Sequence, residues 1–546
     1  MNQPLQADIV VVGSGVAGAL AAARLAKAGL RVIILEAGKP VDRAQAVQNF
    51  WKAAVQVPEC AYPIQPEAIH PTTDRLGDWY QQEGPDFFKS TYLKVTGGTT
   101  WHWLGTCLRL LPSDFQTQTL HGRGVDWPIS YSDLEPYYLQ AEHALGVSGD
   151  SDYDLGSPRS GPFLLPAIPQ TYLDRTLTQA LQNTQFQVQS TPQARNSVVH
   201  DQRPPCCGSS SCIPVCPVQA KYDATIHLKQ AQAAGATLLN QSTVVQLISD
   251  EQGRIRSARF RRWDQSEGQV QAAIFILACH AIETPRLLLA SRTEAWPNGL
   301  ANRSDQVGRN LMDHPVQLSW ALSQDPVYPY RGPLSTSGIE NLRDGDFRSR
   351  RSGYRIEIGN DGWRWPTGAP LTLAAELASR GLSAADLSQT LAHETSRHLR
   401  LTALTEQLPE ADNRVTLDTK KRDHYGVPLP RIHYRIDDYV QQGMQQARKD
   451  HTEIFERLQA SAIQHATDFF GAGHIMGTCR MGADPRDSVV DAQLRSHDHQ
   501  NLFILGSSVF PTGGTANPSL TIAALSLRAA DAIERQFRAP VGQPEK

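Results

Sequence analysis

The chain has 546 residues, of which 20% are charged and 40% are hydrophobic. At about 150 residues per domain, this length predicts three or four folded units. The formal net charge of −3 at pH 7 provides no general basic field to attract nucleic acid or an anionic membrane. No run approaches the roughly 18 apolar residues of a membrane-spanning helix, and the first residues lack the basic segment of an export signal. We therefore expect a globular protein that reaches a membrane only through a partner.

The first residues carry a pattern typical of a nucleotide-binding fold, with a structural glycine turn as the alternative. An apolar run over 8–12 predicts a buried parallel strand, and a helix rich in alanine and leucine follows to about Ala28. A second strand over 31–35 ends at Glu36, whose carboxylate would accept hydrogen bonds from ribose hydroxyls. Glycines before the helix would let the backbone approach a pyrophosphate at the helix N-terminus. These glycines are Gly13, Gly15 and Gly18.

The middle of the chain predicts a second domain. Residues 316–470 contain an amphipathic helix near 384–398. Strands near 399–406 and 414–417 predict an antiparallel sheet able to roof a pocket. The last segment is rich in motifs and ends in a helix over 518–534. The expected division is 1–315, 316–470 and 471–546, with the two outer parts building one domain.

Further motifs follow one another along the chain. They are Gly97-Gly98-Thr99-Thr100-Trp101-His102-Trp103, Asp126-Trp127-Pro128, Tyr131-Ser132-Asp133-Leu134-Glu135-Pro136-Tyr137-Tyr138, Val307-Gly308-Arg309-Asn310-Leu311-Met312-Asp313-His314-Pro315, His474-Ile475-Met476-Gly477-Thr478 and Asn517-Pro518-Ser519-Leu520-Thr521. Together with the glycine fingerprint they resemble the glucose-methanol-choline oxidoreductases over nearly the whole chain. Within that family, the block from Cys206 to Cys216 resembles the catalytic subunits of bacterial FAD-dependent sugar dehydrogenases of the glucose, fructose and sorbitol dehydrogenase type.

The resemblance implies an α/β protein with a Rossmann-like FAD-binding domain and a second, substrate-binding domain built on an antiparallel sheet. It implies FAD as the cofactor, which the glycine spacing alone does not separate from NAD. Gly506 stands where many family members carry an aspartate. The positions that match the family's flavin-binding stretches are Gly97, Gly98, Thr99, Thr100, Asn310 and Gly506.

His474 is the candidate catalytic base, with a solvated or core histidine as the alternative. Oxidising an alcohol requires removal of the hydroxyl proton as a hydride leaves carbon, and an imidazole with a pKa of about 6.5 suits this task. The resemblance places His474 at the flavin and matches Asn517 to the second catalytic position. An amide cannot act as a base, so we expect Asn517 to orient the substrate hydroxyl.

His102 follows the glycine turn at 97–98. In some relatives a histidine at the corresponding point is covalently joined to the flavin, and this turn could present the His102 imidazole to the ring. Packing or hydrogen bonding alone is the alternative, and both interpretations stay open.

Four of the eight cysteines lie within eleven residues. Their spacing, CC-x4-C-x3-C, fits neither a zinc ribbon nor a ferredoxin run, whereas thiolates clustered with glycine and proline suit an iron–sulfur loop. Because adjacent side chains diverge, Cys206 and Cys207 are not expected to bind one cluster together. The resemblance implies a [3Fe–4S] cluster on the loop at about 200–225, held by Cys206, Cys212 and Cys216, with Cys207 as a fourth candidate. Structural zinc and disulfides are the alternatives, and the other four cysteines are expected to be buried thiols.

The hypothesis is an FAD-dependent dehydrogenase that oxidises a sugar or polyol hydroxyl, with an aldose at its anomeric carbon as the favoured substrate. Electrons would pass from the flavin through the cluster to a cytochrome-type acceptor. The resemblance adds a multihaem cytochrome c and a small partner subunit that carries the export signal, hence a periplasmic location, with the cytoplasm as the alternative. The competing functions are an oxygen-using oxidase, a non-redox lyase on the same flavin scaffold, and a zinc-stapled binding protein.

Overall fold

The computed structural model describes residues 3–54, 56–72, 76–329, 331–361 and 370–538. None of the helices in these ranges is long and apolar enough to cross a membrane.

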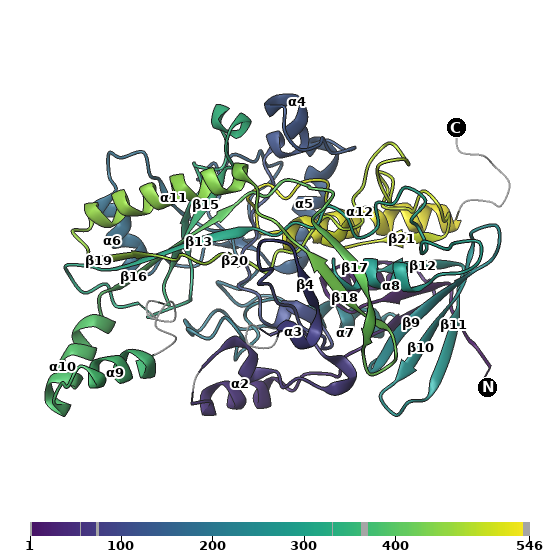
Figure 1. The fold of residues 1–546 in the computed structure, drawn as a ribbon, viewed down its shortest axis with the longest axis horizontal. Helices are drawn as coiled ribbons and strands as arrows, with labels where there is room; N and C mark the ends of the chain where they lie inside the picture. The colour runs from purple at the N-terminus through teal and green to yellow at the C-terminus, as the bar shows by residue number, and fades with distance from the viewer. Residues whose placement is uncertain (1–2, 55, 73–75, 330, 362–369, 539–546) are drawn as a thin grey trace.

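Five parallel strands form a sheet at one end of the molecule (Figure 1). The three inner strands are buried on both faces, as their unbroken apolar sequences predict. The strand order is β21 (Leu502–Ile504), β12 (Ile274–Leu277), β2 (Ile9–Val12), β3 (Val32–Leu35) and β8 (Thr237–Leu239). The predicted strand–helix–strand start is therefore confirmed, and the sheet combines strands from the beginning, the middle and the end of the chain.

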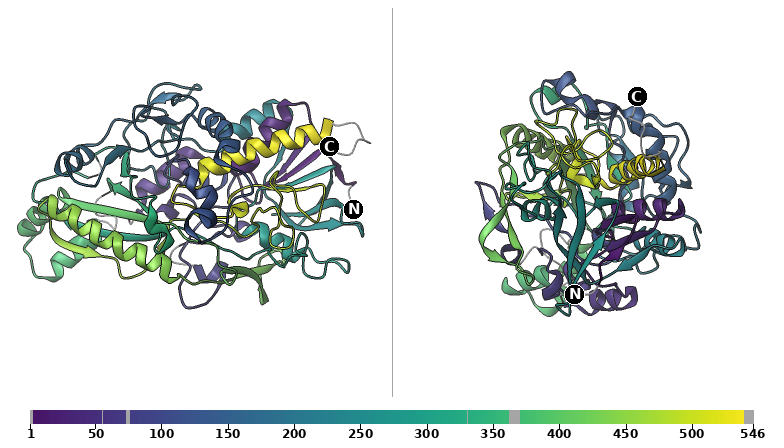
Figure 2. Two further views of the ribbon diagram at one scale, coloured as in Figure 1. Left: turned by 90° about the horizontal axis from the view of Figure 1, so that it is seen from above. Right: turned by 90° about the vertical axis from the view of Figure 1, so that its right-hand side faces the viewer.

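Helices cover this sheet. Helix α1 (Val16–Lys27) is buried along most of its length, because it packs against α12 (Ser519–Arg538) and α7 (Thr225–Ala233). Its many alanines let these neighbours approach closely. In Figure 2 the yellow α12 runs along the same end of the molecule as the parallel strands, and α5 (Tyr131–Leu145) packs against it.

A seven-stranded antiparallel sheet forms the other end of the molecule (Figures 1 and 2). Helix α11 (Asp438–Arg457) lies across β13 and β16 and buries an apolar stripe that includes Val440, Ala447 and Ile454. The strand order is β19 (Ser461–His465), β13 (Pro315–Leu322), β16 (His398–Thr405), β15 (Tyr354–Gly359), β14 (Ser337–Ile339) and β7 (Val188–Ser190), with β20 (Phe470–Gly471) paired to β13. This sheet confirms the expected antiparallel architecture.

Two features of the second sheet differ from the expected segments. Strand β7 joins it from residues 188–190, far before the predicted boundary at 316. Strand β17 (Arg414–Arg422) lies in a separate three-stranded sheet with β18 (Pro428–His433) and β4 (Gln81–Glu83). Strands β17 and β18 form a local hairpin, whereas β7 pairs with β14 and β18 pairs with β4 across long stretches of sequence, which local patterns do not reveal. The three-part division of the chain stays a prediction.

The remaining elements are two further sheets and a set of shorter helices. A four-stranded sheet adjoins the parallel sheet in the order β1 (Leu5–Gln6), β11 (Glu267–Gln271), β10 (Ile255–Arg262) and β9 (Ser242–Ser249), and β5 (Ser148–Gly149) pairs with β6 (Leu165–Pro166). The other α-helices are α2 (Arg43–Lys52), α3 (Leu76–Trp79), α4 (Thr117–His121), α6 (Tyr172–Ala180), α8 (Glu283–Ala290), α9 (Pro370–Ser379) and α10 (Ala384–Thr395).

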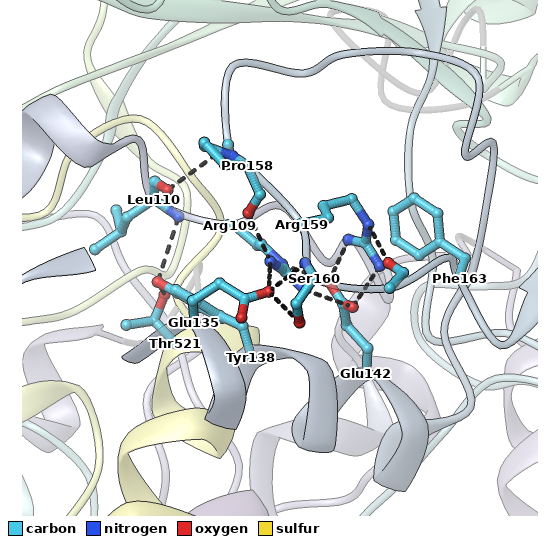
Figure 3. Close-up of polar contacts among 12 residues, drawn as sticks. Arg109, Leu110, Glu135, Tyr138, Glu142, Pro158, Arg159, Ser160, Phe163 and Thr521 are labelled. Carbon is cyan, nitrogen blue, oxygen red and sulfur yellow. Dashed lines mark hydrogen bonds and ion pairs between the residues drawn. The ribbon is translucent and has the colours of Figure 1, made fainter. Parts of the chain in front are cut away.

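A buried charge network ties α5 to the loop that follows it (Figure 3). Glu142 on α5 is fully buried and accepts two hydrogen bonds from Arg109, at 2.8 and 3.0 Å. Arg159, from the loop, donates two more at 2.8 and 2.7 Å and lies over the Phe163 ring. Glu135, about two turns earlier on α5, accepts a hydrogen bond from Arg109 at 3.0 Å. These ion pairs satisfy charges that burial would otherwise make costly.

Candidate active site

A cavity of about 770 Å³ extends from the glycine turn of α1 to the antiparallel sheet. Its volume lies within the range of small-molecule and cofactor sites. The residues that matter below are contributed by the start of α1, the turn near residue 98, β13, β15 and β16, and the segments around 474 and 517.

The glycine fingerprint forms a cradle that only glycine allows. Gly13 has φ +100°, and a Cβ there would lie 2.5 Å from the Ala278 carbonyl oxygen. A Cβ on Gly18 would lie 2.1 Å from the Gly13 oxygen, so this residue permits the close approach of helix and strand. A Cβ on Gly15 would meet nothing within 4 Å, and this residue lines the cavity. The backbone is thus open to a pyrophosphate at the N-terminus of α1, and the cradle fits a dinucleotide.

Glu36 lines the same end of the cavity and is 6% exposed. Its carboxylate accepts hydrogen bonds from the Ser14 N–H and hydroxyl, at 3.0 and 2.5 Å, and from the Gly38 N–H at 2.7 Å. Burial raises the pKa of Glu36, and these donors oppose that effect. The side chain is therefore fixed beside the cradle, where the fingerprint predicts a ribose contact.

The second glycine turn faces the first. Gly97 and Gly98 have positive φ, and the Gly97 N–H donates to the Ser14 hydroxyl at 3.0 Å. Thr99, Thr100 and His102 line the cavity with Gly98. Burial lowers the pKa of His102 to about 3, so its imidazole is neutral at pH 7. The position suits either attachment to a flavin or packing against it.

His474 and Asn517 meet at the far end of the cavity. The Asn517 Nδ2 lies 3.2 Å from Nε2 of His474, and both residues line the cavity. Because an amide N–H donates, Nε2 of His474 accepts, and its ring proton must lie on Nδ1. Burial lowers the pKa of His474 well below its usual value, so the ring is neutral and Nε2 can take a hydroxyl proton.

His314 completes this arrangement, although the sequence motif that contains it gave no indication of its role. Its Nδ1 lies 2.8 Å from Nδ1 of His474. Because the Asn517 contact assigns the ring proton of His474 to Nδ1, His314 accepts a hydrogen bond from that N–H. Burial lowers the pKa of His314 to about 4, which keeps it a neutral acceptor. Asp313 accepts the backbone N–H of both histidines on one carboxylate oxygen, at 2.7 and 2.8 Å. The two histidines are therefore positioned both by their backbone N–H bonds to Asp313 and by the hydrogen bond between their rings.

Asn310 and Gly506, both expected to contact the cofactor, differ in their position relative to the cavity. Asn310 is 3% exposed, does not line the cavity, and donates to the Gln306 side chain at 3.0 Å. Its φ of +62° and the carbonyl beside Gly477 indicate a backbone role. Gly506 does line the cavity, has φ +102°, and a Cβ there would meet nothing within 4 Å. The missing aspartate side chain leaves open space at that position.

The cysteine block, from Cys206 to Cys216, contributes Ile213 to the lining of the cavity. Cys212 is buried, Cys206 and Cys216 are half-buried, and Cys207 is exposed. Burial raises the pKa of Cys206, and the nearby Cys212 and Cys216 thiols act in the same direction.

The cysteine sulfurs take part in hydrogen bonds within this region. The Cys206 and Cys216 sulfurs each accept a backbone N–H at 3.4 Å, from Gly208 and Lys221. Among the described residues, no three His, Cys, Asp or Glu side chains come close enough together to hold a metal ion. The thiols suit a cluster by their chemistry, but they do not form a closed ligand set in this structure.

Lys221 joins the cysteine loop to the glycine turn. Its buried ammonium donates to the carbonyl oxygens of Trp101 at 3.0 Å, Cys212 at 2.6 Å, and Trp103. His102 lies between the two tryptophans, so one cation fixes both the loop and the segment that presents His102. No sequence motif indicated this contact, because it spans 120 residues.

The cavity thus joins a glycine cradle that fits a dinucleotide to a neutral imidazole that can accept a proton, an arrangement that suits an oxidoreductase. The chain belongs to the GMC oxidoreductase family, whose models match residues 8–316 and 409–526. It is therefore an FAD-dependent oxidoreductase that acts on CH–OH groups.

Similar proteins include dehydrogenases of small hydroxylated molecules. The chain is 37% identical to the fructose dehydrogenase large subunit of Gluconobacter japonicus, over 97% of this chain and 98% of that one. It is 29% identical to 2-methyl-1,2-propanediol dehydrogenase of Mycolicibacterium austroafricanum, over 98% and 97% of the two chains. It is 25% identical to the gluconate 2-dehydrogenase flavoprotein of Pantoea cypripedii, over 98% and 95%.

Solved structures show the same fold. Formate oxidase superposes with a TM-score of 0.68 at 16% identity, over 98% of this chain and 99% of that one. Pyridoxine 4-oxidase from Mesorbium loti superposes with a TM-score of 0.64 at 19% identity, over 96% of this chain and 99% of that one. At this identity the likeness concerns the fold alone.

Proposed function

We propose that the protein is a dehydrogenase of sugars or polyols, with an aldose at its anomeric carbon as the favoured substrate. The observation that carries the proposal is that His474 and Asn517 share one cavity with Ile213 of the cysteine loop. Support for a sugar as substrate comes from the relative at 37% identity, which is named a fructose dehydrogenase subunit; the choice of an aldose is the proposal's own.

The chain's residues have distinct parts in this reaction. Nε2 of His474 accepts the hydroxyl proton, while Asn517 beside the same nitrogen orients the hydroxyl oxygen. Bound FAD supplies the acceptor for the hydride that leaves the same carbon. The cradle around Gly15 and Glu36 would hold the nucleotide part of FAD, and the turn with His102 would lie toward its ring.

The proposal includes a [3Fe–4S] cluster on Cys206, Cys212 and Cys216, with Cys207 outside the ligand set because it is exposed. Such a cluster supplies one-electron transfer to an external acceptor. The acceptor is proposed to be a multihaem cytochrome c, and a small partner subunit is proposed to carry the export signal. The relative's name, "large subunit", supports a partner chain. The proposed location is the periplasm, with the cytoplasm as the alternative.

The test is an anaerobic titration of the purified protein with aldoses, ketoses and polyols, followed by visible absorbance, with iron and zinc assayed alongside. Bleaching of the flavin by one neutral sugar, with about three irons per chain, is expected. Flavin without iron, together with peroxide formation in air, would favour an oxidase. A flavin that no sugar bleaches would favour a lyase, and zinc without flavin would overturn the enzyme assignment.

Cysteine variants separate the cluster from the rest of the proposal. Cys212→Ser is expected to lose most of the iron, whereas Cys207→Ser, the matched control, is expected to keep it. Both variants should retain FAD, because neither cysteine lines the cavity. Equal iron contents in the two variants would contradict the ligand assignment.

A further inference from the structure

The wall of the cavity on the antiparallel sheet changes from apolar to charged along its strands. Val316 and Leu404 pair across β13 and β16, next to the segment that carries His474. Two residues further along, Leu318 pairs with Thr402, and Thr402 pairs with Glu357 on β15. All five side chains belong to residues that line the cavity. The polar part therefore begins about 7 Å along the strands from the Val316–Leu404 pair, since a strand rises about 3.4 Å per residue.

Glu357 is held by charge and not by close hydrogen bonds. It is 8% exposed, and its two oxygens lie 3.8 Å from Arg400 and 3.6 Å from Arg355. Both distances are too long for hydrogen bonds. A carboxylate has about four acceptor positions, so Glu357 has free acceptor capacity on a cavity wall. The Arg355 Nη1 is likewise buried without a hydrogen-bond partner among the described residues.

Arg400 and Thr402 complete the polar part. The Arg400 Nε donates to Asp361 at 2.6 Å, and its Nη1 donates to the Thr402 hydroxyl. Because the Thr402 oxygen accepts that bond, its own O–H is left to donate. The wall thus offers one carboxylate acceptor and one hydroxyl donor from the Glu357–Thr402 pair, and a guanidinium from Arg400 two residues further along β16.

We propose that Glu357, Arg400 and Thr402 form the site that binds the distal hydroxyls of a neutral sugar or polyol. The site rests on the proposed function, because it assumes that the reacting hydroxyl lies at His474. The spacing of about two strand residues matches a ring that carries one hydroxyl at the base and others on its opposite edge. An apolar alcohol would leave these buried polar groups without partners, which strongly disfavours it.

The balance of charge selects against sugar acids. Arg355 and Arg400 are paired with Glu340, Glu357 and Asp361. A further cation among the described lining residues, Lys89, lies over Phe470 and pairs with Asp468. Among the described residues of this wall, two arginines face three carboxylates, which leaves none of their positive charges unmatched for a substrate carboxylate. The site therefore fits a neutral ligand.

The test is a deoxy-sugar series measured with the holoenzyme and an artificial acceptor. Glu357→Gln and Thr402→Val are each expected to lower kcat/KM for the parent sugar by about 10- to 100-fold, the worth of a hydrogen bond to a charged or buried partner. The wild type should have a lower kcat/KM for a deoxy sugar that lacks the bound hydroxyl than for the parent sugar. This difference should be smaller in the variant, because the variant lacks the side-chain group that binds that hydroxyl. Glu453→Gln on the outer part of α11, with a side chain 41% exposed, is the matched control and should retain the wild-type kcat/KM.

The outcomes separate the site from the function. If the wild type oxidises no sugar or polyol, the proposed function fails. If it does, but both variants keep kcat/KM within about twofold and the deoxy penalties unchanged, the recognition site is overturned. FAD content and thermal unfolding verify that each variant is folded, and the isosteric Thr402→Val tests the site independently of charge. A sugar acid oxidised as well as its neutral parent would contradict the charge argument.

Discussion

The two ring nitrogens of His474 face different partners, and this division determines what the ring can do. Nδ1 faces His314 at 2.8 Å, whereas Nε2 faces the Asn517 amide at 3.2 Å and the cavity. A neutral imidazole carries one proton, so donation at Nδ1 leaves Nε2 as the acceptor, which the Asn517 amide contacts in this structure and a substrate hydroxyl would contact during the reaction. The chemistry of one residue is thus fixed by a neighbour that itself touches no substrate.

Substitution of His474 tests its role as the base. His474→Gln is expected to lower kcat by about 10²- to 10⁴-fold, the usual contribution of general base catalysis, while FAD content is retained. In the wild type, activity should be lost only as the pH falls through the pKa of His474, because the base must be unprotonated. Burial places that pKa well below 6.5, so the rate should be flat through neutral pH. An acid limb near pH 7 would contradict this assignment.

His314 is expected to act as a positioning residue. His314→Leu removes the acceptor for the Nδ1 proton of His474 and should lower kcat by about 10-fold or more, with little change in KM, because the ring loses its fixed tautomer. His314→Asn, whose side-chain oxygen can replace Nδ1 as an acceptor, should recover part of the loss. Comparable kcat values for the two variants would show that the hydrogen bond has no part in catalysis.

The sequence predicts some of these residues and not others, for a physical reason. His474, Asn517 and the fingerprint glycines lie in short motifs whose spacing carries their role. His314 and Glu357 act through contacts with residues more than 40 positions away. His314 lies in a motif that does not indicate its partner, and nothing local distinguishes Glu357 from other polar residues in strands. Asn310 shows the converse, since its motif predicted a cofactor contact and its side chain lies outside the cavity lining.

At the scale of elements, local patterns predict strands and helices better than their pairing. The strand at Ile9–Val12 and the helix at Ser519–Arg538 agree with their predicted positions within a few residues, because burial on both faces and helical periodicity leave clear signals. Strand Val188–Ser190 was not expected in the second sheet, because it pairs with Ser337–Ile339 across about 150 residues. Such pairings depend on the whole fold.

The network around α5 predicts which single charge matters most for stability (Figure 3). Glu142→Gln is expected to lower the free energy of unfolding by about 3 to 5 kcal/mol, because Arg109 and Arg159 lose the buried carboxylate that balances both. Glu135→Gln on the same helix is the matched control. Its side chain is 14% exposed, forms an ion pair with Arg109 only and accepts hydrogen bonds from Ser160, so the expected loss is smaller, about 1 to 2 kcal/mol. Urea unfolding measures both, and equal losses would refute the ranking.

At the scale of the whole molecule, the cavity depends on both sheets at once. The parallel sheet supplies the cradle at Gly13 and Gly15, the antiparallel sheet supplies the wall at Glu357 and Thr402, and the last part of the chain places His474 between them. This arrangement explains why the chain leaves the first sheet and returns to it twice. It also encloses many polar side chains in the interior, several histidines among them.

Because of these buried histidines, we expect the folded protein to lose stability at acidic pH. Between about pH 6.5 and the lowered pKa values, the unfolded chain binds protons that the folded chain does not, so stability falls as the pH falls. Each such histidine contributes roughly 1.4 kcal/mol per pH unit. Asp313, whose pKa burial raises to about 6, acts in the opposite direction but is outnumbered. The histidines whose pKa burial lowers to about 3 or 4 are His70, His102, His227, His280, His314, His398 and His451.

Thermal or urea unfolding from pH 7.5 to 4.5 measures this loss, which should begin near pH 6.5 and steepen below it. His398 offers the cleanest single test, because burial alone lowers its pKa to about 4 and neither ring nitrogen has a hydrogen-bond partner among the described residues. His398→Leu should therefore reduce the slope below pH 6.5 by roughly 1.4 kcal/mol per pH unit, with little effect at pH 7.5. A stability profile that stays flat down to pH 5, or a variant whose slope equals that of the wild type, would show that these rings take up protons without unfolding the chain.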